Sequence, residues 1–127
     1  MQIPAQRKQT ILIVDDEENI RLVVSRILEK QGYNVLLAGS GHEALQICRD
    51  YRPPIHLILA DLIMPGMSGV EFVKQVITVR PRVRVLYISD SYMLKQAFAE
   101  QPGLLFIEKP FTAEELAKKV SAALQLS

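Results

Sequence analysis

The sequence predicts one α/β domain in which helices cover both faces of a parallel sheet. Five short apolar runs alternate along the 127 residues with segments whose apolar residues recur at three- and four-residue steps. Each intervening segment is long enough to carry the chain back to the start of a parallel neighbour. We therefore expect a doubly wound sheet of five strands with five helices, in the flavodoxin-like strand order 2-1-3-4-5. Residues 1–9 are expected to form a flexible tail and residues 10–127 the domain.

Each expected strand is a short, continuous apolar run rich in β-branched residues, which is typical of strands buried on both faces of a sheet. The runs span residues 10–15, 33–38, 55–60, 82–89 and 104–108. The run IHLILA at 55–60 is the most apolar of them, so we expect it at the centre of the sheet.

The first two helices are expected over residues 17–31 and 40–51. Gly32 follows the first, as glycine often follows a helix end. Ser40 stands three residues before Glu43, the spacing of a capping box, and two prolines follow the second helix. The apolar stripe of the first helix consists of Ile20, Val23, Val24, Ile27 and Leu28.

The other three helices are expected over residues 68–79, over 92–100 and after Thr112. The Pro65-Gly66 pair forces a loop before the first of these, and Thr112 with Glu115 repeats the capping-box pattern. The residues expected to face inward are Val70, Val73, Val76 and Ile77 in the third helix, and Leu116, Val120, Ala123 and Leu124 in the last.

The composition narrows the possible functions. A net charge of +1 provides no overall basic field, so we expect no nucleic-acid binding. No apolar stretch approaches the roughly 18 residues of a membrane span, so we expect no membrane insertion. The single cysteine, Cys48, is expected on the inner face of the second helix and cannot form an internal disulfide. These features suit a reducing compartment, and we expect a cytoplasmic protein.

Several chemically active side chains stand where apolar runs end. Asp15 and Asp16 follow ILIV, Asp61 follows IHLILA, Ser89 closes VRVLYIS, and Lys109 follows LLFIE. The carboxyl ends of parallel strands meet at one edge of an open α/β sheet, where ligands bind. Three carboxylates, a hydroxyl and an ammonium at one edge predict a site for a divalent cation and a phosphoryl group.

The paired acids are the predicted metal ligands. Asp15 and Asp16 would repel each other unless a cation neutralised them, and a set of hard oxygen ligands favours Mg²⁺. The alternative is that acids are stabilised by the dipole of the following helix, typically by less than about 1 kcal/mol each. That explanation suits Glu17 and Glu18 better than Asp15, which still belongs to the strand end.

Asp61 is the predicted nucleophile, because a carboxylate can accept a phosphoryl group as an acyl phosphate. An aspartate at a strand end is more often a turn residue or an N-cap. Here the next helix begins several residues later, which argues against capping. Lys109 would balance the carboxylates and later the phosphoryl oxygens, and Ser89 would offer its hydroxyl to the same group. Alternatively, both are ordinary residues after strands.

Four motifs, VDDEENIR, LADLIMPGMSGVE, YIS and FIEKPF, occur in this order between Ile11 and Leu126. Together they resemble the receiver domain of the response regulators of two-component signal transduction. The resemblance implies that a histidine kinase or a histidine phosphotransfer domain phosphorylates Asp61 in a Mg²⁺-dependent reaction. Asp16 would bind the metal directly and Asp15 often through water, and the backbone carbonyl of Ile63 would complete the metal site. The domain would be a phosphorylation-controlled module of a phosphorelay and not an enzyme acting on an external substrate.

The resemblance also implies a conformational switch. Ser89 and Lys109 match the hydroxyl and lysine that respond to phosphorylation, and Phe106 matches the aromatic side chain that turns inward on activation. A downstream partner or a second copy would bind the face formed by helix four, strand five and helix five. The motifs LYIS and KPFTAEEL are more similar to receivers attached to hybrid histidine kinases than to those fused to DNA-binding domains. If the chain were cut from such a protein, the parent would be a histidine kinase.

Asp90 and His56 are among the residues that depart from the family pattern. Asp90 stands where a small residue is usual, and it either disfavours a nearby phosphoryl group or points to solvent and caps the next helix. His56, at the start of the third strand, is interpreted as a surface substitution and not as a ligand.

Alternative functions are a receiver-like interaction module that is never phosphorylated, a Mg²⁺-dependent aspartyl-phosphate phosphatase and a flavin carrier. The phosphatase would need a general acid at the position of Ile63, and the flavin carrier would need phosphate-cradling loops that are not apparent.

Overall fold

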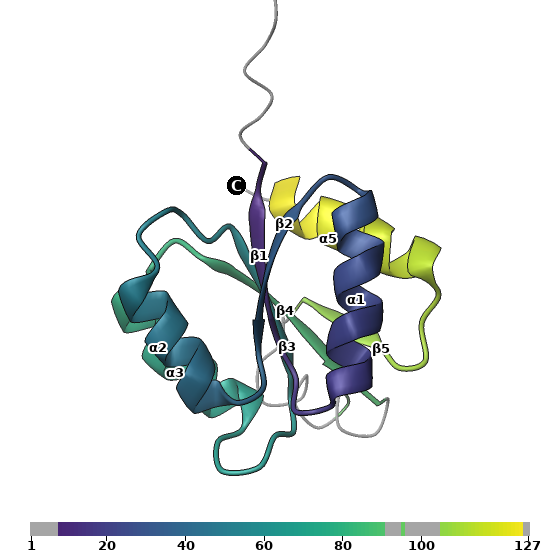
Figure 1. Ribbon diagram of the computed structural model, residues 1–127. Helices are drawn as coiled ribbons and strands as arrows, with labels where there is room; N and C mark the ends of the chain where they lie inside the picture. Colours follow the sequence, from purple (N-terminus) through teal and green to yellow (C-terminus); the bar gives the residue numbers. More distant parts are fainter. Residues whose placement is uncertain (1–7, 91–94, 96–104, 126–127) are drawn as a thin grey trace, which may run out of the picture.

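The computed structural model describes residues 8–90, 95 and 105–125. Within them, five parallel strands form one sheet in the order β2-β1-β3-β4-β5 (Figure 1). The predicted fold class and strand order are therefore confirmed. The strands are β1 (Thr10–Val14), β2 (Asn34–Ala38), β3 (Leu57–Asp61), β4 (Arg84–Ser89) and β5 (Phe106–Glu108).

The described helices are α1 (Glu18–Lys30), α2 (Gly41–Asp50), α3 (Gly69–Val79) and α5 (Ala113–Gln125). They correspond to the first, second, third and last predicted helices. The helix expected over 92–100 lies outside the described residues, apart from Lys95. No helix in the described ranges is long and apolar enough to cross a bilayer.

The sheet separates two apolar cores. Helices α1 and α5 cover one face, whereas α2 and α3 cover the other (Figure 1). Successive strand residues point to opposite faces, so Leu12 and Ile58 pack toward α2 and α3, and Ile11 and Leu57 pack toward α1 and α5. All residues of β1 and β3 are buried, which confirms the central position predicted for the third run.

The caps predicted at Ser40 and Thr112 are confirmed. The Ser40 hydroxyl accepts a hydrogen bond from the Glu43 N–H at 3.1 Å, although the Glu43 carboxylate bonds the Gly39 N–H and not that of Ser40. At α5 the capping box is complete: the Thr112 hydroxyl accepts from the Glu115 N–H at 3.0 Å, and the Glu115 carboxylate accepts from the Thr112 N–H at 3.3 Å.

Two residues predicted to face inward are exposed. Val23 in α1 is 54% exposed and Ile77 in α3 is 49% exposed. Both lie at the margin of the apolar stripe of their helix. The fully buried residue that the α3 prediction missed is Phe72.

An arginine closes the end of α2. The Arg80 guanidinium donates to the backbone carbonyls of Cys48 at 3.0 Å, Pro53 at 3.1 Å and Tyr51. Arg80 is the C-cap residue of α3, so its side chain fastens α3 to the segment that leads from α2 into β3. Cys48 is buried and free, as its place on the inner face of α2 predicted.

His56 has a structural role that its interpretation as a surface substitution missed. It is half-buried, and its Nδ1 atom accepts a hydrogen bond from the Thr10 N–H at 2.9 Å. The His56 N–H donates to the Thr10 carbonyl, also at 2.9 Å. The residue therefore ties the start of β1 to the segment before β3.

Candidate functional site

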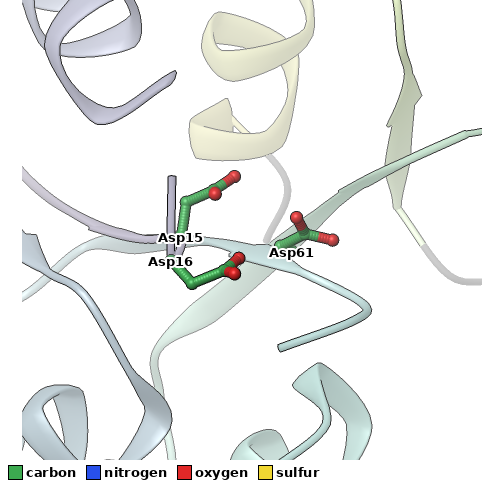
Figure 2. A group of neighbouring side chains, drawn as sticks. All are labelled: Asp15, Asp16 and Asp61. Carbon is green, nitrogen blue, oxygen red and sulfur yellow. The ribbon is translucent and has the colours of Figure 1, made fainter. Parts of the chain in front are cut away.

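The paired acids and Asp61 lie at the carboxyl edge of the sheet because β1 and β3 end there together. Val14 pairs with Ala60 in the register of these strands, so Asp15 follows β1 beside Asp61, the last residue of β3. The Asp15 N–H donates to the Ala38 carbonyl at 3.1 Å, which extends the pairing with β2 by one bond. Figure 2 shows Asp15, Asp16 and Asp61 grouped at this edge.

The three aspartates offer a compact set of oxygen ligands. One carboxylate oxygen from each lies within 4.8 Å of the others. Asp15 and Asp61 are 2% and 7% exposed, whereas Asp16 is exposed to solvent. Such an all-oxygen cluster, open on one side, could bind a hard divalent cation.

One carboxylate oxygen of Asp15 lacks a hydrogen-bond donor in the described part of the chain. Its Oδ1 accepts a hydrogen bond from the Glu17 N–H at 2.9 Å, but its buried Oδ2 has no hydrogen-bond partner among the described residues. Burial raises the pKa of Asp15 from its ordinary 3.8 to about 6; the charge on Asp61 adds to the rise, while the Glu17 N–H and Lys109 oppose it. A buried oxygen without a donor is costly, and a bound cation would satisfy it.

Lys109 supplies a positive charge between two of the carboxylates. Its Nζ lies 3.2 Å from Oδ2 of Asp61 and 3.7 Å from Oδ2 of Asp15. Burial lowers the pKa of Lys109, but the charges of Asp61 and Asp15 raise it more, so the net pKa lies above its usual value. The side chain is therefore protonated at neutral pH.

The strand ends also determine where Lys109 and Ser89 lie. Lys109 directly follows β5, its N–H donates to the Ser89 carbonyl at 2.8 Å, and the Lys109–Pro110 bond is cis. Ser89 is the last residue of β4 and is buried. In the register of β3 with β4, Asp61 pairs with Ile88, so Ser89 lies one residue beyond the partner of Asp61.

The remaining predicted residues surround this edge. Ile63 is 50% exposed in the loop after β3, and its N–H donates to Oδ1 of Asp61 at 3.0 Å. Phe106, the first residue of β5, is half-buried, and Nζ of Lys119 lies 5.6 Å from the centre of its ring. Asp90 is exposed at the end of β4.

Two residues near the site were not predicted from the sequence. Nη1 of Arg21 donates to the Asp15 carbonyl at 2.7 Å and so restrains the turn between β1 and α1. Gly69 begins α3, and a Cβ atom there would collide with the Asp61 carbonyl oxygen. Gly69 follows Ser68, the N-cap of α3, and this position is the sequence feature that could have indicated its role. No sequence feature beyond helical spacing indicated the role of Arg21.

Comparisons with known proteins agree with this geometry. Residues 11–121 match the family described as Response regulator receiver domain. The chain is 33% identical over 120 residues to sporulation initiation phosphotransferase F of Bacillus subtilis, covering 93% of this chain and 95% of that protein. It is 30% identical over 120 residues to the sensor kinase CckA of Brucella abortus, covering 91% of this chain but only 12% of that protein. The crystal structure of the receiver domain from the hybrid histidine kinase CckA matches with a TM-score of 0.77 and 34% identity, covering 91% of this chain and 99% of that one.

Proposed function

The chain belongs to the response regulator receiver domain family, and on that premise we propose that Asp61 is the residue that accepts the phosphoryl group. A receiver is a phosphoacceptor signalling module and not a turnover enzyme, so the phosphatase and flavin-carrier alternatives are set aside. The observation that carries the proposal is the pairing of Asp61 with Lys109. A carboxylate oxygen 3.2 Å from an ammonium is a nucleophile with one counter-charge already in position, and the two further carboxylates beside it could hold a cation.

Phosphorylation would proceed by in-line displacement. An Asp61 carboxylate oxygen attacks the phosphorus of a phosphohistidine, an O–P bond forms and the N–P bond breaks. The phosphohistidine ring keeps the proton on its other nitrogen, so the imidazole leaves as a neutral group. Reactions of this kind depend mainly on positioning and electrostatics. Lys109, 3.2 Å from Asp61 Oδ2, stabilises the negative charge on the transferring oxygens. The Ile63 N–H holds the other Asp61 oxygen in a fixed orientation at 3.0 Å.

The residues present fit the Mg²⁺ that the family uses. Asp15, Asp16 and Asp61, with the backbone carbonyl of Ile63, would hold the ion, and the unpartnered buried oxygen of Asp15 supports this assignment. When bound, Mg²⁺ supplies positive charge that offsets the phosphoryl oxygens and screens the carboxylates from one another.

Ser89 and Phe106 would transmit the change. A new dianion on Asp61 attracts the Ser89 hydroxyl, and the space it leaves allows Phe106 to turn inward from its half-buried position. This shifts the population between two packings of one fold. The face that changes includes β5 and α5, where a downstream partner or a second copy would bind.

Receivers interact with histidine kinases and phosphotransfer proteins, and we assign one of these as the phosphodonor in the cytoplasm. The matches include a phosphotransferase of similar length and a much longer sensor kinase. A parent hybrid kinase is therefore compatible with the chain, as is a small phosphorelay protein.

The test is phosphorylation with acetyl phosphate and Mg²⁺, followed by intact mass and peptide mapping. The wild type should gain one phosphoryl group, on Asp61, and Asp61→Asn should gain none. Asp50→Asn, which alters an exposed aspartate outside the cluster, is the matched control and should react normally. Full phosphorylation of Asp61→Asn, or a modified peptide without residue 61, would refute the assignment.

A further inference from the structure

The edge of the sheet opposite the carboxylates, where the strands begin, is hollowed. It lies at the top of Figure 1. One cavity of about 430 Å³ is lined in part by Arg82 and Arg84. A neighbouring hollow of about 720 Å³ is lined in part by Arg49 and Arg52, and Arg80 borders both. We call this surface the amino edge.

The amino edge carries a concentrated positive charge. Its two hollows are lined by five arginines and a single carboxylate, Asp50. Within the described ranges, none of these guanidinium groups forms an ion pair with a carboxylate. Because the whole chain has a net charge of only +1, the remainder of the molecule carries net negative charge. The balanced composition therefore conceals a strongly basic local surface.

Folding accounts for only part of this cluster. Arg80 donates to carbonyls at the end of α2, and Nη1 of Arg84 donates to the Leu124 carbonyl near the end of α5 at 2.6 Å. Both stabilise helix C-termini, where positive charge is favourable. Arg52 and Arg82, by contrast, are exposed in loops, and neither donates a hydrogen bond to any residue that the structure describes. Their charges add to those of the other guanidinium groups of the amino edge, and an external anion would offset the resulting repulsion.

The walls of the smaller cavity indicate what kind of anion fits. Besides its arginines, it is lined by Pro54, Ile55, Pro81 and Val83, which provide apolar surface, and by Gln9 and His56. The His56 ring is held in place by the hydrogen bond that its Nδ1 accepts from the Thr10 N–H. A peptide segment matches both features, because an apolar side chain can enter the cavity while neighbouring carboxylates meet the guanidinium groups. A nucleic acid would leave the apolar walls without a partner.

We propose that the amino edge binds an acidic segment of a partner protein, in which glutamate or aspartate flanks an apolar side chain. The surface lies about 13 Å from Asp61, the distance spanned by the four residue steps of β3 from Leu57. Its occupant therefore does not cover the phosphoacceptor and can remain bound in both phosphorylation states. The proposal stands whether or not Asp61 is the phosphorylated residue.

The experiment uses a fluorescein-labelled peptide of alternating glutamate and leucine, followed by fluorescence anisotropy and by amide chemical shifts of ¹⁵N-labelled protein. We expect saturable binding, with shifts concentrated between residues 49 and 56 and between 80 and 84. Arg52→Glu and Arg82→Glu should each weaken binding about tenfold. Lys74→Glu, an equal charge change on the exposed surface of α3, should leave it unchanged.

Several outcomes would overturn the proposal. Absence of saturable binding would do so, as would an equal loss in Lys74→Glu, which would reveal only non-specific attraction. Tighter binding of duplex DNA or of phosphatidylglycerol vesicles than of the peptide would assign the surface to a different polyanion. If either glutamate variant fails to fold by circular dichroism, Arg52→Gln and Arg82→Gln replace it with the same direction of change expected.

Discussion

Replacing Asp15 by asparagine should stabilise the metal-free protein at neutral pH. Asp15 is 2% exposed, and burial raises its pKa from 3.8 to about 6. The folded state therefore binds this proton more tightly than the unfolded chain does. Stability that is fully present below about pH 3.8 is lost as the pH rises through about 6, because the buried carboxyl must then ionise.

The size of the effect follows from the pKa. A rise from 3.8 to about 6 corresponds to at most about 3 kcal/mol, since each tenfold change in proton affinity is worth about 1.4 kcal/mol. The asparagine retains an oxygen for the Glu17 N–H but loses the charge that attracts the Lys109 ammonium, so we expect a gain of about 1–3 kcal/mol.

Urea unfolding followed by circular dichroism in EDTA measures this prediction. At about pH 7, Asp15→Asn should be more stable than the wild type, and the difference should shrink toward about pH 4. Asp50→Asn, at an exposed carboxylate, controls for the substitution itself. Added Mg²⁺ should stabilise the wild type more than the variant. An Asp15→Asn protein that is less stable at neutral pH, with wild-type stability unchanged between these two pH values, would refute the reasoning.

Other substitutions test the remaining roles. Asp16→Ala should lower Mg²⁺ affinity at least about tenfold and Asp15→Ala should lower it by less, as measured by titration at fixed ionic strength. Unchanged affinity in Asp16→Ala would show that Asp16 is not a metal ligand. Lys109→Ala should cost about 1 kcal/mol of stability yet uncouple phosphorylation from partner binding, and a phosphorylated variant that binds like the wild type would contradict this. Ile63→Glu should speed hydrolysis of the acyl phosphate, because Ile63 has no polar group that could orient the attacking water. The rate is measured after removal of the phosphodonor, and an unchanged rate would show that Ile63 does not slow the reaction. Arg80→Ala should destabilise the fold by about 2–4 kcal/mol in thermal unfolding, and a loss below that of a typical surface substitution would mean that its carbonyl partners find water.

The features that the sequence predicted well are those written in consecutive residues. An apolar run such as LILA cannot be satisfied at a surface, so its burial in β3 followed directly. The convergence of Asp61 and Lys109 could be predicted because each stands at the end of such a run, and parallel strands bring their ends to one edge. Caps were equally local: Thr112 and Glu115 are three residues apart.

The features that were missed depend on partners far away in the chain. The bond between Thr10 and His56 spans 46 residues, and no pattern around His56 reveals it. Arg80 contacts Cys48 across 32 residues of the chain, so its hydrogen bonds depend on how α2 and α3 lie in the fold and could not be predicted from local sequence. The predicted burial of Val23 and Ile77 was wrong for a different reason. Helical spacing gives the direction of an apolar stripe but not how many of its residues are covered in the fold.

Among the residues that the structure describes, each buried strand residue of the two apolar cores belongs to one core or the other, so the sheet acts as a partition. Phe106 is the point where this partition can be bypassed. It packs with the core under α2 and α3, yet its ring lies beneath Lys119 of α5, a helix of the opposite core. Because β5 is the last strand of the sheet, the contact passes around its margin. A movement of the Phe106 ring would therefore change its contact with α5 without rearrangement of any strand, so a rigid sheet would be compatible with a surface that changes.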